Sequence, residues 1–238
     1  MQINAANPSR PARLEWTLTV LLGANLAWTS LGLGGYRPET RVVTWLLTGV
    51  LLGVSLVAGA IQRRPLSSLH PAGWALVPFL VYAALNVAWL SPVPWLGWLD
   101  WFGWLNVAVT FWVALNGIQS GPARRALFLV LVGLGVVAVA LACHQRFVQP
   151  DWLIGGRQQA AQFVGRSSGF FGIPNSLAGL LILLLPATGT LAWRGGATAR
   201  VGWGWVTAVL AYGLFLTLSR GAWLSLALAL LAWPLLAS

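Results

Sequence analysis

Residues 126–143 read ALFLVLVGLGVVAVALAC and carry no charged side chain. Because an α-helix rises about 1.5 Å per residue, about 20 apolar residues of this kind cross the ~30 Å hydrocarbon layer of a membrane. Apolar blocks of similar length recur along the chain, approximately at 15–34, 42–61, 71–90, 99–119, 125–144, 172–193, 201–218 and 221–238. The pattern predicts an all-α fold, a polytopic bundle of about eight transmembrane helices that forms a single domain over 1–238.

The composition excludes a soluble domain of any size. Of the 238 residues, 58% are hydrophobic and only 8% are charged, and the mean hydropathy is +0.77. A soluble domain usually has about 25% charged residues. Arg10 and Arg13 precede the first apolar block as they would in a signal peptide, but this block is longer than an apolar signal region of about 7–15 residues. We therefore expect a retained first helix.

The charge pattern predicts how the helices are oriented. The net charge is +10, and the 14 basic residues are all arginines that stand singly or in pairs between apolar blocks. Such spacing is typical of charges that orient helices in a bilayer, so no nucleic-acid partner is expected. With the N-terminus in the cytoplasm, the inner loops would hold Arg10, Arg13, Arg63, Arg64, Arg124, Arg125, Arg194 and Arg200, and the outer loops Arg37, Arg41, Arg146, Arg157, Arg166 and Arg220.

Few residues are available for metal or ion chemistry. The chain has four acidic residues, no two of them close in sequence, and Cys143 is its only cysteine. Metal-dependent glycosyltransferases and phosphatases gather carboxylates around a divalent ion, and ion-coupled transporters often place carboxylates at mid-membrane. We therefore expect no metal and no other cofactor.

The strongest functional signal is arginine on the predicted outer side. The connection over about 145–171 is the longest in the chain, and Arg166 precedes Pro174 and Asn175, which suit a helix start. Arg220 lies where two helices are joined by almost no loop. If both guanidinium groups and the helix N-terminus converge, they form a diphosphate site. Alternatively, each arginine extends to the lipid headgroups by itself.

Weaker candidates lie at the same predicted surface. Arg146 and Arg157 would extend the anion-binding surface, and His144 could act as a general base or could simply cap its helix. A cluster of tryptophans over 95–104 predicts an interfacial aromatic belt, with a sugar-stacking platform as the alternative. The asparagines within or near helix ends are expected to bond between helices; they are Asn25, Asn86, Asn106 and Asn116.

Residues 165–238 resemble the start of the conserved region of the O-antigen ligase and O-antigen polymerase family of bacterial inner-membrane proteins. An arginine and a glycine precede an aromatic pair, Pro-Asn opens an apolar helix, and Thr-x-Ser-Arg-Gly follows about forty residues later. The matching residues are Arg166, Gly169, Phe170, Phe171, Pro174, Asn175, Pro186 and 217–222, which read Thr-Leu-Ser-Arg-Gly-Ala. The first 160 residues match only in character, as a run of helices.

The resemblance implies a metal-independent, inverting transfer of a glycan at the periplasmic face. The donor would be an undecaprenyl-diphosphate-linked glycan, and the acceptor lipid A–core, a growing polysaccharide or a protein. Arg166 and Arg220 would be the catalytic residues that hold the donor diphosphate, with Asn175 and Ser219 as further substrate-binding residues. The implied location is the bacterial inner membrane, and the arginine pattern described above predicts a multi-pass chain with its N-terminus in the cytoplasm.

The chain also departs from the family. Members have more helices and, after the region matched here, a large periplasmic loop with a histidine thought to activate the acceptor. This sequence stops at Ser238, within its eighth predicted helix. We therefore expect a fragment, or a truncated member that is not catalytic by itself. Two alternatives stay open, a flippase or transporter for a lipid-linked glycan and a non-catalytic membrane partner.

Overall fold

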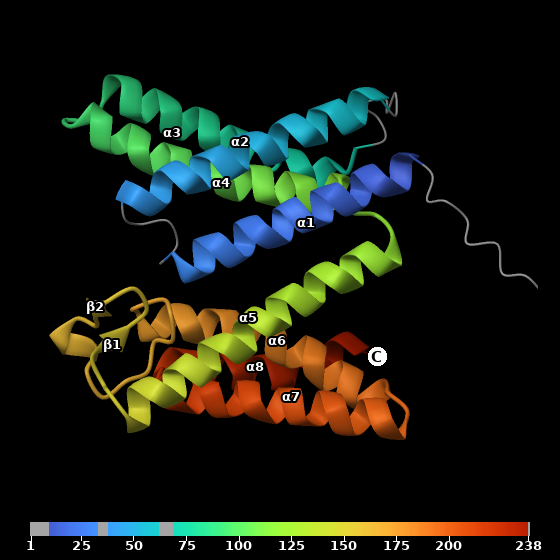
Figure 1. Ribbon diagram of the computed structural model, residues 1–238, viewed down its shortest axis with the longest axis vertical. Coiled ribbons are helices and arrows are strands. Elements are labelled where there is room, and N and C mark those ends of the chain that lie inside the picture. Colours follow the sequence, from blue (N-terminus) through green and yellow to red (C-terminus); the bar gives the residue numbers. More distant parts are fainter. Residues whose placement is uncertain (1–9, 33–37, 62–68, 238) are drawn as a thin grey trace, which may run out of the picture. The chain divides into compact units, whose positions relative to one another are not determined.

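The predicted all-α helix bundle is confirmed by the computed structural model, which describes residues 10–32, 38–61 and 69–237 and is 80% helical (Figure 1). The α-helices of the described residues are α1 (Arg10–Leu31), α2 (Pro38–Ile61), α3 (Val77–Trp89), α4 (Pro94–Asn116), α5 (Gly121–Phe147), α6 (Pro174–Arg194), α7 (Ala197–Leu216) and α8 (Arg220–Ala237). Short elements are the 3-10 helices η3 (Pro71–Trp74) and η4 (Ala161–Phe163) and the strands β1 (Trp152–Leu153) and β2 (Arg157–Gln158).

Five helical segments of the described chain are long and apolar enough to cross a membrane. They are Glu39–Ile61, Pro71–Trp89, Gly121–Phe147, Pro174–Arg194 and Ala197–Leu216. Most of their side chains are not buried within the protein, since at most 33% of each apolar window is covered. Apolar side chains that the protein leaves exposed are expected where lipid surrounds a helix. The fold is therefore that of a multi-pass membrane protein.

Prolines explain two differences from the predicted helix boundaries. The single helix expected over 71–90 is divided into η3 and α3, because Pro78 has no N–H to donate and its ring would clash with the carbonyl group of Trp74. Pro94 lies in the first turn of α4, where a missing N–H costs nothing, so α4 begins about five residues earlier than expected.

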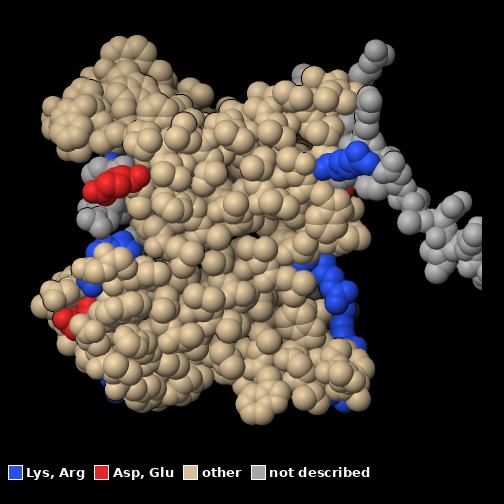
Figure 2. All heavy atoms as spheres, in the orientation of Figure 1, with Lys and Arg blue, Asp and Glu red and all other residues tan. Residues whose placement is uncertain are grey.

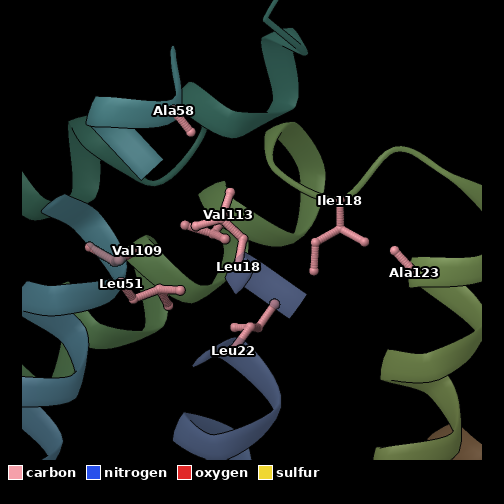
Figure 3. Close-up of a cluster of buried hydrophobic side chains, with 8 residues drawn as sticks. All are labelled: Leu18, Leu22, Leu51, Ala58, Val109, Val113, Ile118 and Ala123. Atoms are coloured by element: carbon pink, nitrogen blue, oxygen red, sulfur yellow. The ribbon is translucent and has the colours of Figure 1, made fainter. Parts of the chain in front are cut away.

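The chain forms two compact units, unit 1 (1–29 and 35–129) and unit 2 (30–34 and 130–238). Leucines and valines of α1, α2 and α4 form the core of unit 1, and Figure 3 shows Leu18 of α1 beside Val113 of α4. Both residues are almost fully buried. The single domain expected over the whole chain stays a prediction.

Polar contacts in unit 1 connect helix ends that are far apart in the sequence. The carboxylate of Glu15, near the start of α1, accepts hydrogen bonds from the backbone N–H groups of Gln119 and Ser120 just before α5, both at 2.6 Å. Arg41 near the start of α2 forms an ion pair with Asp100 of α4, with 3.8 Å between Nη2 of Arg41 and Oδ1 of Asp100. The start of α1 therefore lies at the end of α4 and the start of α2 lies near the start of α4, so α1 and α2 run in opposite directions.

An amide contact joins α1 to α4 inside unit 1. The side-chain amide of buried Asn25 donates to Oδ1 of Asn106 at 3.0 Å, and the hydroxyl group of Thr48 on α2 approaches the same oxygen. Polar side chains commonly bond between helices in membranes because lipid offers them no partner. The predicted interhelical bonding is thus confirmed for Asn25 and Asn106.

Close helix packing characterises unit 2. A Cβ atom at Gly213 of α7 would clash with Val139 of α5, and one at Gly135 of α5 would lie 2.7 Å from Leu184 of α6. Small residues at these positions let the helix backbones approach, which is how helices pack where no water is expelled. The end of α5, the start of α6, the end of α7 and the start of α8 lie together, and we call this the connection end of unit 2 (Figure 1).

Candidate functional site

The connection from α5 to α6, residues 148–173, lies at the connection end and is folded. Strands β1 and β2 pair antiparallel, with Leu153 opposite Arg157, across a turn in which Gly155 and Gly156 have positive φ. The turn of η4 follows, and the backbone N–H of Gln159 donates to the carbonyl oxygen of Asp151 at 2.6 Å. A connection of this length that is held by its own hydrogen bonds is typical of functional loops.

The side chain of Gln145 of α5 holds this connection through hydrogen bonds to its backbone. Its side chain is 2% exposed, and its Oε1 accepts from the backbone N–H groups of Ser168 at 2.8 Å and Gly169 at 2.9 Å. Its Nε2 donates to the carbonyl oxygens of Trp152 and Gly169, both at 2.9 Å. One neutral side chain therefore satisfies backbone groups at the start and at the end of the connection, which would otherwise be buried without partners.

A second buried glutamine extends the same network. Oε1 of Gln159 accepts from the hydroxyl group of Ser168 at 2.7 Å. Nε2 of Gln159 donates to the carbonyl oxygens of Phe163 at 2.6 Å and Arg166 at 2.8 Å. Because Gln159 holds the backbone oxygen of Arg166, the network determines where the side chain of Arg166 begins.

The segment just after Arg166 is pressed against two helices. The hydroxyl group of Ser167 donates to the carbonyl oxygen of Ala142 at 2.9 Å. Its backbone N–H donates to the carbonyl oxygen of Leu216 at 3.0 Å. Gly169 has a φ of +58°, and a Cβ atom there would lie 2.8 Å from the carbonyl oxygen of Ala138. Only glycine fits both the conformation and the close approach to α5.

The guanidinium group of Arg166 reaches from the connection to the other helix ends. Its Nε donates to the carbonyl oxygen of Thr217 at 3.1 Å, and one terminal nitrogen donates to Oδ1 of Asn175 in the first turn of α6 at 3.0 Å. Both acceptors are neutral, so they orient the group without cancelling its charge. Arg166 thus joins Asn175 to the junction of α7 and α8.

The junction of α7 and α8 is a tight turn built by Thr217. The buried hydroxyl group of Thr217 donates to the carbonyl oxygen of Leu214 at 2.7 Å and accepts from the backbone N–H of Ser219 at 3.2 Å. Leu218 has a φ of +51°, a left-handed conformation that is costly for a residue with a Cβ atom. Such strain persists where the surrounding structure enforces it, and it concentrates at functional sites.

Arg220 is the first residue of α8 and lies three residues after the carbonyl group that Arg166 binds. It is exposed, and its side chain makes no hydrogen bond or ion pair with a described residue. The structure therefore brings Arg166, Asn175, Ser219 and Arg220 to one end of unit 2. Of these, Arg166 and Asn175 are in direct contact.

The weaker candidates hold the connection together. Arg146 donates to the carbonyl oxygen of Gly165 at 2.7 Å, and Arg157 donates to that of Ile154 at 2.8 Å. The ring of His144 packs edge-on against Trp152, with ring centroids 4.8 Å apart. In each case a side chain that the sequence placed near the site contacts the connection, and its role toward a ligand stays a prediction.

The connection end carries excess positive charge. It holds Arg146, Arg157, Arg166 and Arg220 against one acidic residue, Asp151. Figure 2 shows that charged atoms lie at the helix ends of unit 2, whereas the surface between these ends is uncharged on the face in view. Within 10–32, 38–61 and 69–237, no three metal-ligating side chains come together. The arrangement is suited to an anion at the level of the lipid headgroups.

Gln145, Gln159 and Thr217 are the residues of this site to which the sequence assigned no specific role. Glutamine in a connection has no pattern of its own, because its partners are backbone groups that only the fold brings near. Thr217 did stand within the resemblance motif, where its place before Ser219 was the available signal. Comparison of the chain with models of protein families, with characterised proteins and with solved structures found no match.

Proposed function

We propose that the protein transfers a glycan from an undecaprenyl-diphosphate carrier to an acceptor at the periplasmic face of the bacterial inner membrane. The observation that carries the proposal is the position of Arg166, whose guanidinium group contacts Thr217 and Asn175 near Arg220. Both of its partners are neutral, so two cationic groups at this end are available to one diphosphate. The resemblance to the O-antigen ligase and polymerase family supports the same assignment.

The proposed chemistry needs charge stabilisation on the leaving group. The acceptor hydroxyl oxygen attacks the anomeric carbon, the bond from that carbon to the phosphate oxygen breaks, and the diphosphate leaves with the electron pair. Arg166 and Arg220 stabilise the charge that develops on the diphosphate in the transition state. The proton of the hydroxyl group goes to a general base, for which His144 is the candidate in unit 2.

The proposed membrane orientation places the connection end in the periplasm and the N-terminus in the cytoplasm. It is supported by the paired arginines at 63–64 and 124–125, which the sequence predicts on the opposite side of an alternating bundle; the pair at 63–64 lies outside the residues that the structure describes. Cysteine labelling of intact cells tests it directly. In a Cys143→Ser background, a cysteine at exposed Gln149 should react with a membrane-impermeant maleimide, and one at exposed Ala197 should react only after the cells are opened.

A transporter for the same carrier is the second candidate, and the charge distribution disfavours it. Moving a diphosphate across the bilayer requires polar or charged groups along the path. In the described helices α6 and α7, the charged side chains are Arg194 and Arg200, both near the helix ends opposite to the connection. We therefore rank the transferase first and a non-catalytic membrane partner third.

The proposal is tested in the full-length gene, expressed in a bacterial strain that lacks its own ligase or polymerase. Arg166→Ala and Arg220→Ala should each reduce surface glycan at least about a hundredfold, as expected when a group that stabilises transition-state charge is lost. Arg200→Ala removes the same charge at the opposite helix end and should leave the glycan unchanged. Normal glycan in the Arg166 and Arg220 variants would reject the assigned roles.

A binding measurement distinguishes the transferase from the two alternatives. Purified protein should bind undecaprenyl diphosphate more tightly than undecaprenyl phosphate, and the difference should disappear in Arg166→Ala. Glycan movement across vesicles without a new glycosidic bond would favour a transporter. Absence of both transfer and carrier binding would favour a non-catalytic partner.

A further inference from the structure

A groove lies at the end of unit 2 opposite to the connection, and we call this the groove end. It is formed between α6, α7 and α8 and has a volume of about 620 Å³. The lining residues that matter for its chemistry are Pro186, Gly189, Thr190 and Arg194 of α6, Thr207 of α7 and Leu230 of α8. Its size is in the range of small-molecule sites, about 300–1,000 Å³.

The interior of the groove is apolar, although two threonines line it. The hydroxyl group of Thr190 donates to the carbonyl oxygen of Pro186 at 2.7 Å, and that of Thr207 donates to the carbonyl oxygen of Trp203 at 2.8 Å. Both hydroxyl hydrogens are therefore used within their own helices, and most of the surface that lines the groove is apolar. A hydrocarbon chain suits such a surface better than a polar ligand does.

The mouth of the groove is cationic and lies at the depth of lipid headgroups. Arg194 is the last residue of α6 and is exposed, and its side chain makes no hydrogen bond or ion pair with any residue that the structure describes. Trp193 beside it is 84% exposed, as is typical of the aromatic belt at a membrane interface. Since α6 rises about 1.5 Å per residue over its 21 residues, Arg194 lies one hydrocarbon thickness from Pro174.

We propose that this groove binds one anionic phospholipid, with an acyl chain between α6, α7 and α8 and the phosphate group on Arg194. Basic pockets between transmembrane helices commonly bind anionic lipid headgroups. The groove offers both halves of such a ligand, an apolar channel and a guanidinium group at its mouth. The site is separate from the connection end, so it does not depend on the proposed glycan transfer.

The groove allows a variant that fills it without disturbing the fold. A Cβ atom at Gly189 would have no neighbour within 4 Å, so Gly189→Leu extends a side chain into open space. Arg194→Gln removes the charge at the mouth and keeps a polar side chain. Arg200→Gln is the matched control, because exposed Arg200 near the start of α7 is not among the residues that line the groove.

The experiment measures lipid binding by native mass spectrometry of the purified full chain, with phosphatidylglycerol and phosphatidylcholine of identical acyl chains as probes. Arg194→Gln should weaken phosphatidylglycerol binding about fivefold to tenfold and leave phosphatidylcholine unchanged. Gly189→Leu should abolish the tightest-bound lipid of both kinds, and Arg200→Gln should match the unaltered protein.

Two results would overturn the proposal. Equal losses in Arg194→Gln and Arg200→Gln would mean that phosphatidylglycerol follows net charge rather than this groove. A protein that is dimeric before the change and monomeric in Gly189→Leu would mean that a second copy occupies the groove instead of a lipid.

Discussion

The arginines near the two ends of α6, Arg166 and Arg194, have different surroundings. At the connection end, Arg166 is oriented by neutral oxygens of Thr217 and Asn175, above a network of buried glutamine amides. At the groove end, Arg194 stands beside an apolar channel without a bond to a described residue. A guanidinium group that is held by hydrogen bonds can select a ligand by geometry, whereas one without such partners contributes mainly its charge. The first arrangement suits a reaction and the second suits a lipid.

Among variants at the two ends of unit 2, Gln145→Leu is expected to lower the free energy of unfolding most. The change leaves two backbone N–H groups and two carbonyl groups at the connection end without their partner, and each unsatisfied buried group costs about 1–3 kcal/mol. We expect the free energy of unfolding to fall by about 3 kcal/mol or more in equilibrium unfolding of the detergent-solubilised protein. Limited proteolysis should then cut within 148–173.

Gln149→Leu is the control for that variant, since Gln149 is exposed and should change stability by less than about 0.5 kcal/mol. Lipid binding at the groove end should persist in Gln145→Leu once the protein is folded. If the two glutamine variants were equally stable, the buried network would not be what holds the connection.

A smaller loss of stability is expected from Gly169→Ala. The added Cβ atom meets the carbonyl oxygen of Ala138 and forces alanine into a left-handed conformation, which together should cost about 2 kcal/mol or more. Gly165→Ala isolates the conformational part, because Gly165 also has positive φ but a Cβ atom there would meet nothing within 4 Å. Equal losses in the two variants would show that the approach to α5 is unimportant.

The smallest changes in the free energy of unfolding are expected from two threonine variants, one at each end of unit 2. Thr217→Val removes the hydroxyl group that accepts from Ser219 in the turn before α8, and it should lower the free energy of unfolding by about 1 kcal/mol. Thr190→Val removes a hydroxyl group that bonds only to its own helix, so its effect should stay within about 0.5 kcal/mol. The reverse order in the same unfolding assay would contradict the contrast between the ends.

The fold was largely predictable because a lipid environment permits few backbone structures. With no water in the bilayer, a spanning chain must satisfy its own backbone groups, so an apolar block of about 20 residues is read as a helix with little ambiguity. What the pattern could not predict was local, such as the break between η3 and α3. There Pro78 lies inside an apolar block, and the effect of one missing hydrogen bond is not visible in hydropathy.

The site was predictable only in part. The motifs indicated Arg166 and Arg220, but arginines that bind a ligand and arginines that support a loop look the same in a sequence. Arg146 and Arg157 were expected on the anion-binding surface, and the structure shows each donating to a carbonyl group of the connection. The supporting role of Gln145 depends on contacts with residues 7 to 24 positions away, which only the folded connection creates.

The central claim is that the positive charge of Arg166 is available to an anionic ligand because both of its hydrogen-bond partners are neutral. Asn175→Asp tests this claim most directly. The new carboxylate is nearly identical in shape to the amide, so it should still accept the bond from Arg166 and leave the unfolding temperature unchanged or higher. Pyrophosphate binding to the purified protein, measured by calorimetry, should weaken about tenfold because the carboxylate neutralises Arg166. Gln149→Glu adds the same charge at this end away from Arg166 and should have a much smaller effect. Unchanged pyrophosphate affinity in Asn175→Asp would contradict the account.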